Sequence, residues 1–293
     1  MIAATQHIAE DFTMAADIDV AEQLASQTVF QDRYRDPSMA PPAQWNETLE
    51  TLIAHRSIRN FLPKPLPPGA VELLVAAAQS ASSSSNLQVW SVVTVENPDT
   101  KAQLSEYAGN QKHIREAPLF VAWLADLRRI RSLGEQSETP TVGADYLEMG
   151  ITAMVDAALA AQNAFVAVES MGLGAVYIGA MRNHPEKVAE LLGLPPNVFC
   201  VFGMCVGWPD LTAGEAIKPR LPQSVVLHKE RYAEPDAADI AAYNARIREF
   251  QSEQKMAAVD WSHQSVGRVK DIKGLMGRER MREALDNLKF PLK

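Results

Sequence analysis

The most continuous apolar pattern in the chain lies between residues 145 and 171, DYLEMGITAMVDAALAAQNAFVAVESM. It predicts one helix of about 27 residues, because the segment is rich in alanine and Gly172 follows it as a C-terminal stop. The segment is apolar on nearly all sides, and a helix without a polar face must be covered on every side. We therefore expect a long buried helix whose outer side is covered by a second subunit.

Four shorter segments have the apolar runs or alternation typical of strands: QVWSVVTVEN (88–97), APLFVAWLAD (117–126), GAVYIGAM (174–181) and NVFCVFGMCVGW (197–208). Shorter helices are expected at 47–56, 68–81, 99–109, 185–193, 236–256 and 277–289. Helices and strands follow one another without strict alternation. This indicates an α+β fold class, with a mixed sheet sandwiched by helices.

Three parts are expected along the chain. Residues 1–46 form an N-terminal extension, in which DIDVAEQLASQTVFQDRY (17–34) favours one amphipathic helix before several prolines interrupt it. Residues 47–232 form the core, and residues 233–293 form a C-terminal helical extension that packs on the core or on a partner subunit. Within the core, RRIRSLGEQSETPTVGADY (128–146) follows the second predicted strand.

Composition and charge narrow the class of protein. The chain has 293 residues, 47% hydrophobic residues and a formal net charge of −8, which is typical of a soluble globular protein. An acidic chain of this kind does not favour general nucleic-acid binding. The first residues lack the pattern of a signal peptide, and the longest apolar run is interrupted by Asp156, Gln162 and Asn163, which argues against a membrane span. We expect a cytoplasmic protein.

Both cysteines, Cys200 and Cys205, lie in one predicted strand. Five positions apart in a regular strand, their side chains should point to opposite faces, so we expect two free thiols in the core and no disulfide.

Several common chemistries lack their sequence patterns. There is no phosphate-binding loop ending in Gly-Lys-Ser/Thr and no Gly-x-Ser-x-Gly elbow. The six histidines are scattered, and no Cys-x-x-Cys pair is present, so no zinc site is indicated. GLGAVYIG begins like a dinucleotide fingerprint, but Tyr177 replaces the third glycine and the segment enters a strand. No metal is expected.

Three clusters of hydrogen-bond donors remain. His55, Arg56, Ser57 and Arg59 lie in HRSIRNF; hydroxyl or amide side chains occupy every position but Leu87 in SSSSNLQ (82–88); and Lys218 and Arg220 flank Pro219 in IKPRLP. Proline favours an extended backbone before it, which turns Lys218 and Arg220 to the same side. Each cluster taken alone fits a solvated surface or a helix-ending loop. Together they supply cations and neutral donors suited to one phosphate and one polar ring system.

The segments HRSIRNF, SSSSNLQVW, GNQKHI, GLGAVYIGAMRN, FGMCVGWP and KPRLP resemble, in order and spacing, the FMN-dependent nitroreductase family. Within it, the chain is most similar to the NfsA-type group of oxygen-insensitive nitroreductases and flavin reductases. The resemblance covers residues 48–232 well and the C-terminal helices loosely, and the first 46 residues have no recognised counterpart. It implies the nitroreductase fold and a homodimer with FMN at the subunit interface. The family resemblance also implies a mobile substrate lid at residues 128–146, after the second predicted strand.

The resemblance also implies roles for individual residues. His55, Arg56, Ser57, Lys218 and Arg220 correspond to the residues that hold the FMN phosphate. Arg59 corresponds to a cation near the flavin N1 and C2 carbonyl, where it stabilises the reduced flavin. Ser83, Ser84 and Asn86 correspond to residues that reach the flavin from the partner subunit, and Gln111 to one near the ribityl or pyrimidine part. Tyr177, Ile178, Gly179 and Ala180 correspond to the segment along the ring; Tyr177 and Ile178 would also suit the core of any sheet.

The reaction implied is a ping-pong hydride transfer. NADPH or NADH reduces the flavin, and a nitroaromatic, quinone or flavin acceptor then takes two electrons, so no dedicated acid–base side chain is expected. NADPH-preferring members use clustered C-terminal arginines, whereas here Arg246, Arg248, Lys255 and Arg268 are dispersed in the sequence. An alternative is an FMN-binding carrier or redox sensor without efficient turnover, and reductive dehalogenation or flavin supply are further activities within the same fold.

Overall fold

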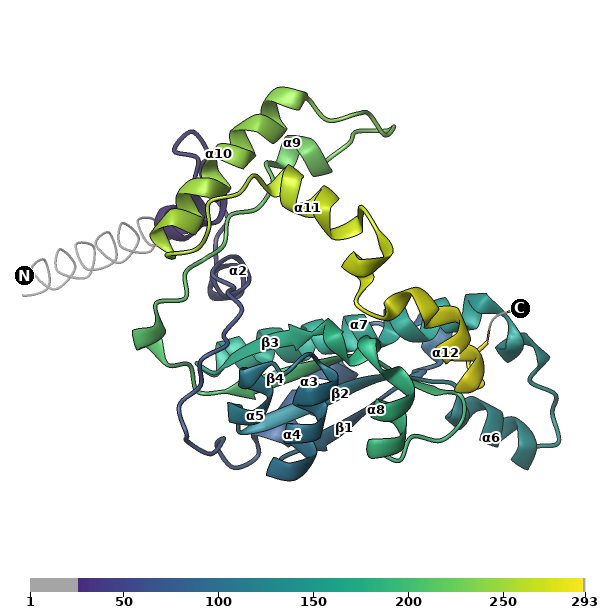
Figure 1. Cartoon of the computed structure of the whole chain (residues 1–293). Coiled ribbons are helices and arrows are strands. Elements are labelled where there is room, and N and C mark those ends of the chain that lie inside the picture. Colours follow the sequence, from purple (N-terminus) through teal and green to yellow (C-terminus); the bar gives the residue numbers. More distant parts are fainter. Residues whose placement is uncertain (1–25, 292) are drawn as a thin grey trace, which may run out of the picture. The chain divides into compact units, whose positions relative to one another are not determined.

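The computed structural model describes residues 26–291 and residue 293, which fall into two compact units (Figure 1). The first unit contains residues 26–56 and 216–266, and the second contains residues 57–215 and 267–293. Of the helix expected at 17–34, residues 26–34 are helical, and the remainder lies outside the described residues.

A four-stranded antiparallel sheet is the centre of the second unit. Its strands are β1 (Trp90–Val95), β2 (Leu119–Asp126), β3 (Gly174–Ile178) and β4 (Val198–Gly207), in the order β1-β2-β4-β3. Each strand lies inside one of the four segments predicted from the sequence. The predicted α+β class is therefore confirmed.

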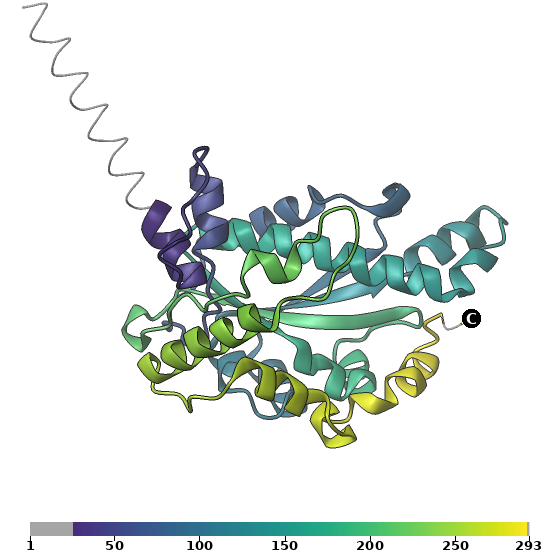
Figure 2. The same ribbon diagram turned by 90° about the horizontal axis from the view of Figure 1, so that it is seen from above.

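Helices cover both faces of this sheet (Figures 1 and 2). On one face, Leu119, Val121 and Trp123 of β2 pack with α3 (Ala70–Gln79) and α7 (Leu147–Ser170). On the other face, the alternate residues Phe120, Ala122 and Leu124 share a core with α4 (Pro98–Tyr107), α5 (Lys112–Glu116) and α8 (Pro185–Leu191). All eight residues of β2 are buried, as its unbroken apolar run predicted.

Helix α7 has two different apolar sides. Ala160, Ala164 and Phe165 are buried against the sheet and α3, as in a core helix, although length and composition alone would also allow α7 to cross a membrane. Its other side carries Leu147, Ile151, Val155 and Leu159, which are 44–50% exposed. These four residues recur every fourth position and so form one stripe along the helix. We call them the α7 stripe.

The expectation that Cys200 and Cys205 face opposite sides of the sheet is wrong. Both thiols are free and buried in the same core cluster. The reason is a shift in register: Trp123 of β2 pairs with Phe202, but Leu124 pairs with Cys200, so Val201 is an extra residue in β4. A bulge of this kind reverses the alternation of side chains beyond it.

The segment expected to be a mobile lid contains regular structure. It forms helix α6 (Arg128–Gln136) and a 3₁₀ turn, Val142–Asp145. Arg131 joins the two parts, because its Nη2 donates to the Ala144 carbonyl at 2.8 Å and to Asp145 Oδ1 at 2.9 Å. Asp145 also pairs with Lys293 at 2.7 Å.

The first unit contains α2 (Glu47–Ile53), α9 (Gln223–Val226) and α10 (Ala237–Glu253), and α10 confirms the helix expected at 236–256. Its small core joins Tyr243, Ile247 and Phe250 of α10 to Leu221 and Trp261.

The last two helices of the chain differ in how well the sequence predicted them. Helix α11 (Trp261–Val269) was not predicted, whereas α12 (Met281–Asn287) lies within the helix expected at 277–289.

Candidate functional site

Part of one predicted donor cluster lies beside another in the first unit, whereas Ser57 and Arg59 of the first cluster belong to the second unit. His55 and Arg56 follow the end of α2, and Lys218 and Arg220 lie in the extended segment before α9. Arg33 joins the two stretches: its Nη1 donates to the Lys218 carbonyl at 2.7 Å, and its Nη2 donates to the His55 carbonyl. The structure therefore brings together predicted residues that are more than 150 positions apart in the chain.

The Lys218–Arg220 segment has the alternation that its proline predicted. Pro219 is buried, while Lys218 and Arg220 on either side are exposed. Tyr243 of α10 fixes the backbone of this segment, because its hydroxyl donates to the Pro219 carbonyl at 3.0 Å. Burial raises the pKa of Tyr243, and the positive charge of Arg220 nearby opposes that rise. The two cations thus stand on a fixed backbone.

The end of the first motif belongs to the second unit. Ile58 donates its N–H to the Ala175 carbonyl of β3 at 2.9 Å, and its side chain is buried in the core. Arg59 is exposed, and its backbone N–H donates to Glu215 Oε1 at 2.7 Å. Among the residues that the structure describes, the Arg59 guanidinium has no carboxylate partner within ion-pairing distance.

Arg59 lies close to the turn that carries Gln111. Burial lowers the pKa of His113, and the positive charge of Arg59 lowers it further. The Nε2 atom of His113 is buried without a hydrogen-bond partner in the described part of the chain. Gln111 itself donates from Nε2 to the Ala108 carbonyl at 3.0 Å. Arg59 therefore lies within electrostatic reach of the segment that carries Gln111 and His113.

The serine-rich loop is tied to a carboxylate in helix α7. Ser83 Oγ donates to Asp156 Oδ2 at 2.6 Å, Ser84 N–H donates to Oδ1 at 3.1 Å, and Val89 N–H donates to Oδ2 at 3.3 Å. Asp156 is only 1% exposed. A buried carboxylate is retained where donors of this kind satisfy it. The sequence analysis treated Asp156 only as an interruption of an apolar helix and missed this role.

Backbone strain is concentrated in the same loop. Ser85, Asn86 and Gln88 have φ of 49°, 56° and 50°, in the left-handed region that residues with a side chain rarely adopt. Gln88 is held on both sides, because its N–H donates to Ser83 Oγ at 2.8 Å and Arg129 Nη1 donates to its carbonyl at 2.7 Å. Strain of this kind persists where the surroundings enforce it, and it is common at functional sites.

The predicted ring-lining segment spans the end of β3 and the 3₁₀ turn Gly179–Asn183. Ile178 and Ala180 are buried in the core, and the Tyr177 ring packs against Phe165 and Phe202 at centroid distances of 5.0 and 5.1 Å. Burial also raises the pKa of the Tyr177 phenol. These side chains therefore serve the core, which leaves the backbone of the segment for any contact with a ligand.

Three arginines of the second unit form a cationic cluster that the sequence did not reveal. Burial lowers the pKa of Arg278, and the positive charges of Arg182 and Arg268 lower it further, so Arg278 lies within electrostatic reach of each of the other two guanidiniums. Arg278 Nε donates to Asn183 Oδ1 at 2.8 Å, and Arg182 donates to the Val201 carbonyl. Within the described residues none of the three forms an ion pair. Arg182 and Arg278 were not considered in the sequence analysis, because they lie on different elements.

Arg246 and Arg248, in contrast, are neutralised within the first unit. Arg246 pairs with Asp36 at 2.5 Å, and Arg248 pairs with Asp260.

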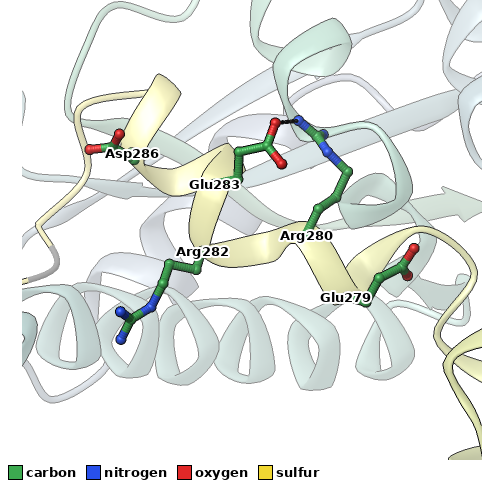
Figure 3. A pocket seen from close by; sticks show the side chains of 5 residues that line it. All are labelled: Glu279, Arg280, Arg282, Glu283 and Asp286. Carbon is green, nitrogen blue, oxygen red and sulfur yellow. Dashed lines mark hydrogen bonds and ion pairs between the residues drawn. The ribbon is translucent and has the colours of Figure 1, made fainter.

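A pocket of about 540 Å³ lies along α12 and is lined by charged residues: Glu279, Arg280, Arg282, Glu283 and Asp286 (Figure 3). Arg280 is engaged there by Glu186 at 2.6 Å and Glu283 at 2.9 Å. None of the predicted site residues lines this pocket. The described residues contain no group of three potential metal ligands.

Comparisons with known proteins identify the family. The sequence profile of the nitroreductase family matches residues 52–208, and the profile of the nitroreductase family C-terminal domain matches residues 218–293. The chain is 40% identical over 228 residues to the NADPH-flavin oxidoreductase of Vibrio harveyi, covering 76% of this chain and 91% of that protein. It is 39% identical over 203 residues to the oxygen-insensitive NADPH nitroreductase of Salmonella typhimurium, covering 69% and 82% of the two chains.

A solved structure gives the same result. The NADPH:FMN oxidoreductase from Vibrio harveyi complexed with NAD⁺ is similar with a TM-score of 0.75 and 37% identity, over 83% of this chain and 98% of that chain. The chain therefore belongs to the nitroreductase family, and within it to the group of oxygen-insensitive nitroreductases and flavin reductases. The resemblance found in the sequence motifs is confirmed.

Proposed function

We propose that this protein is an FMN-dependent oxidoreductase that passes two electrons from NADPH or NADH to nitroaromatic, quinone or flavin acceptors. Relatives that cover most of this chain are an NADPH-flavin oxidoreductase and an NADPH nitroreductase. Bound FMN would supply the redox chemistry, since it accepts a hydride and returns two electrons together. The observation that carries the proposal is the Arg33 contact, which joins the His55–Arg56 and Lys218–Arg220 stretches.

The residues present fit an FMN phosphate. His55, Arg56, Ser57, Lys218 and Arg220 would hold it, as the family resemblance implies. Guanidinium groups bind phosphate oxygens through charge-assisted pairs of hydrogen bonds, and no metal is needed for that contact. In the part of the chain that is described, Arg56 has no carboxylate partner within ion-pairing distance, so its charge is not neutralised by another residue.

The family resemblance implies which residues would bind the ring end of the cofactor. Arg59 would supply positive charge beside the pyrimidine edge, where negative charge develops on reduction. Gln111 would donate to the polar edge of the ring system or to the ribityl chain. The backbone of Tyr177, Ile178, Gly179 and Ala180 would lie along the ring, because their side chains are used largely in the core. The protein's part is to bind, orient and polarise the cofactor.

The α7 stripe supports a homodimer. Four aliphatic side chains of one helix face are about half exposed, although α7 is otherwise a core helix. A contiguous apolar surface of this kind marks an interaction site. The serine-rich loop is tied to Asp156, which follows Val155 of the stripe in α7. Ser83, Ser84 and Asn86 would therefore lie at the edge of the interface, from which they can reach the flavin of the partner subunit.

The Arg182, Arg268 and Arg278 cluster would bind the phosphate of the nicotinamide nucleotide. Arg278 is repelled by both Arg182 and Arg268, and none of the three forms an ion pair with a carboxylate among the described residues, so a dianion such as the 2′-phosphate of NADPH would stabilise them. The cluster adjoins the proposed ring-lining segment, because Arg182 lies two residues after Ala180 in the same 3₁₀ turn. This favours NADPH over NADH as the electron donor.

We propose a cytoplasmic location, in keeping with the two free thiols. Purified protein should be yellow with bound FMN and should oxidise NADPH rapidly when a quinone is present under air. A yellow protein whose flavin stays oxidised under the same conditions would favour the alternative, an FMN carrier or redox sensor.

A further inference from the structure

We propose that Arg33 is a positioning residue for the phosphate end of the FMN site, and that the described part of the N-terminal extension thereby contributes to this site. The inference rests on the proposed function. Arg33 precedes the region matched by the family profile, which begins at residue 52. Arg33 forms hydrogen bonds to the backbone of His55, Lys218 and Arg220, so its effect on the cofactor would act through these residues.

The contacts of Arg33 converge on the backbone of two segments. Its Nε and Nη2 donate to the Ile53 carbonyl at 3.0 and 2.8 Å, and its Nη2 also donates to the His55 carbonyl. Its Nη1 donates to the Lys218 carbonyl at 2.7 Å. The backbone carbonyl of Arg33 in turn accepts the Arg220 N–H at 3.0 Å. One residue therefore bonds to the main chain of both cation-bearing stretches.

The position of these carbonyls explains why an arginine is suited to the contact. Ile53 ends α2, and the last carbonyls of a helix have no donor within the helix. A cation at this end also interacts favourably with the helix dipole. Arg33 is 5% exposed, and the rigid fork of a guanidinium can reach several carbonyls at once, which a lysine ammonium cannot do with the same geometry.

The segment that carries Arg33 is itself anchored within the first unit. Arg35 pairs with Glu253 of α10 at 2.6 Å, and Arg246 of α10 pairs with Asp36 at 2.5 Å. Phe30 packs against Tyr34 at a centroid distance of 5.1 Å. The extension from residue 26 onward is thus a packed part of this unit, and Arg33 lies on a fixed segment.

Loss of the Arg33 contacts should release the two cation-bearing stretches from one another. The protein should then bind the phosphate more weakly, whereas its binding of the isoalloxazine ring should not change. Riboflavin has the same ring and ribityl chain as FMN but no phosphate. The ratio of the two affinities therefore isolates the effect of Arg33.

The experiment measures the dissociation constants of FMN and riboflavin for full-length apoprotein by quenching of flavin fluorescence. The wild type, Arg33→Ala, Arg33→Lys and Arg231→Ala are compared. Arg33→Ala should weaken FMN binding by about tenfold or more and leave riboflavin binding within about twofold of the wild type. The FMN affinity of Arg33→Lys should lie between those of the wild type and Arg33→Ala. Arg231→Ala removes an exposed arginine of the same unit, and it should keep the wild-type ratio.

The outcomes separate the two proposals. If the wild type does not bind FMN, the proposed function fails. The role of Arg33 is overturned if the wild type prefers FMN over riboflavin and Arg33→Ala keeps that preference. It is likewise overturned if Arg33→Ala weakens the binding of FMN and of riboflavin equally. Should Arg33→Ala not fold, Arg33→Lys decides: an FMN-to-riboflavin ratio lowered by about threefold or more supports the role, and an unchanged ratio refutes it.

Discussion

The hydroxyl of Ser83 donates a hydrogen bond of 2.6 Å to the buried carboxylate of Asp156, and this contact ties the serine-rich loop to the long helix of the second unit. The two residues are 73 positions apart. Asp156 also accepts the N–H groups of Ser84 and Val89 at the two ends of the loop. The left-handed conformations of Ser85, Asn86 and Gln88 are thus held between fixed ends.

Replacing Asp156 by Asn should destabilise the protein. The amide has one acceptor oxygen in place of two, so at least one buried donor of the loop loses its partner, at a cost of about 1–3 kcal/mol. Urea unfolding should report a decrease of that size in the free energy of unfolding, together with weaker FMN binding. Asp99→Asn is the matched control, because Asp99 is exposed in the first turn of α4 and its loss should cost less than about 1 kcal/mol. Equal stability of the two variants would contradict the role of Asp156.

Replacing Arg59 by Ala should slow the reduction of bound FMN by NADPH. In the proposed site the guanidinium would lie where negative charge develops on the flavin, and removal of such a stabilising group lowers the rate by about tenfold or more. Stopped-flow absorbance at saturating FMN measures this step directly. Arg59→Lys should recover part of the rate, and the exposed Arg231→Ala should leave it unchanged. A wild-type rate in Arg59→Ala would refute the assignment.

Removal of one member of the arginine cluster should weaken the use of NADPH and leave the use of NADH nearly unchanged. Arg268→Ala should raise the KM for NADPH by about tenfold and change the KM for NADH by less than about twofold, because only NADPH carries the 2′-phosphate. Steady-state assays with a quinone acceptor measure both constants. Arg282→Ala removes an exposed arginine of α12 and should alter neither. Parallel increases for both nucleotides would show that the cluster does not recognise the 2′-phosphate.

A charge placed in the α7 stripe should break the homodimer. Val155→Arg would bury a cation in an apolar interface, which is too costly without a partner. Analytical ultracentrifugation should detect a dimer for the wild type and a monomer for the variant, with loss of bound flavin. Leu211→Arg alters another exposed aliphatic residue outside α7 and should remain dimeric. A monomeric wild type, or a dimeric Val155→Arg variant, would contradict the proposed interface.

Local patterns predicted the elements of the second unit well. The four strands and the long helix follow from alternation, apolar runs and the stop at Gly172, which has φ of 72° as a left-handed helix end requires. The faces of β4 were not predictable in the same way. The bulge at Val201 depends on pairing with β2, and it moved Cys200 to the same core as Cys205.

The residues that support the candidate site were harder to find than those that would form it. Arg33 and Asp156 make their contacts with carbonyls and amides 185 and 72 residues away, and such distances leave no periodic signal in the sequence. The arginine cluster was missed for the same reason, since Arg182, Arg268 and Arg278 lie on three separate elements. The sequence did offer one sign: an acidic residue inside an apolar helix needs a partner.

The most direct measurement is the absorbance of the FMN-loaded protein during an anaerobic cycle. NADPH is added in a single equivalent, and a quinone follows after the first reaction is complete. The account predicts that the visible flavin band disappears with NADPH and returns fully with the quinone. A protein that does not retain FMN, or whose flavin band is unchanged by NADPH and NADH alike, would contradict it.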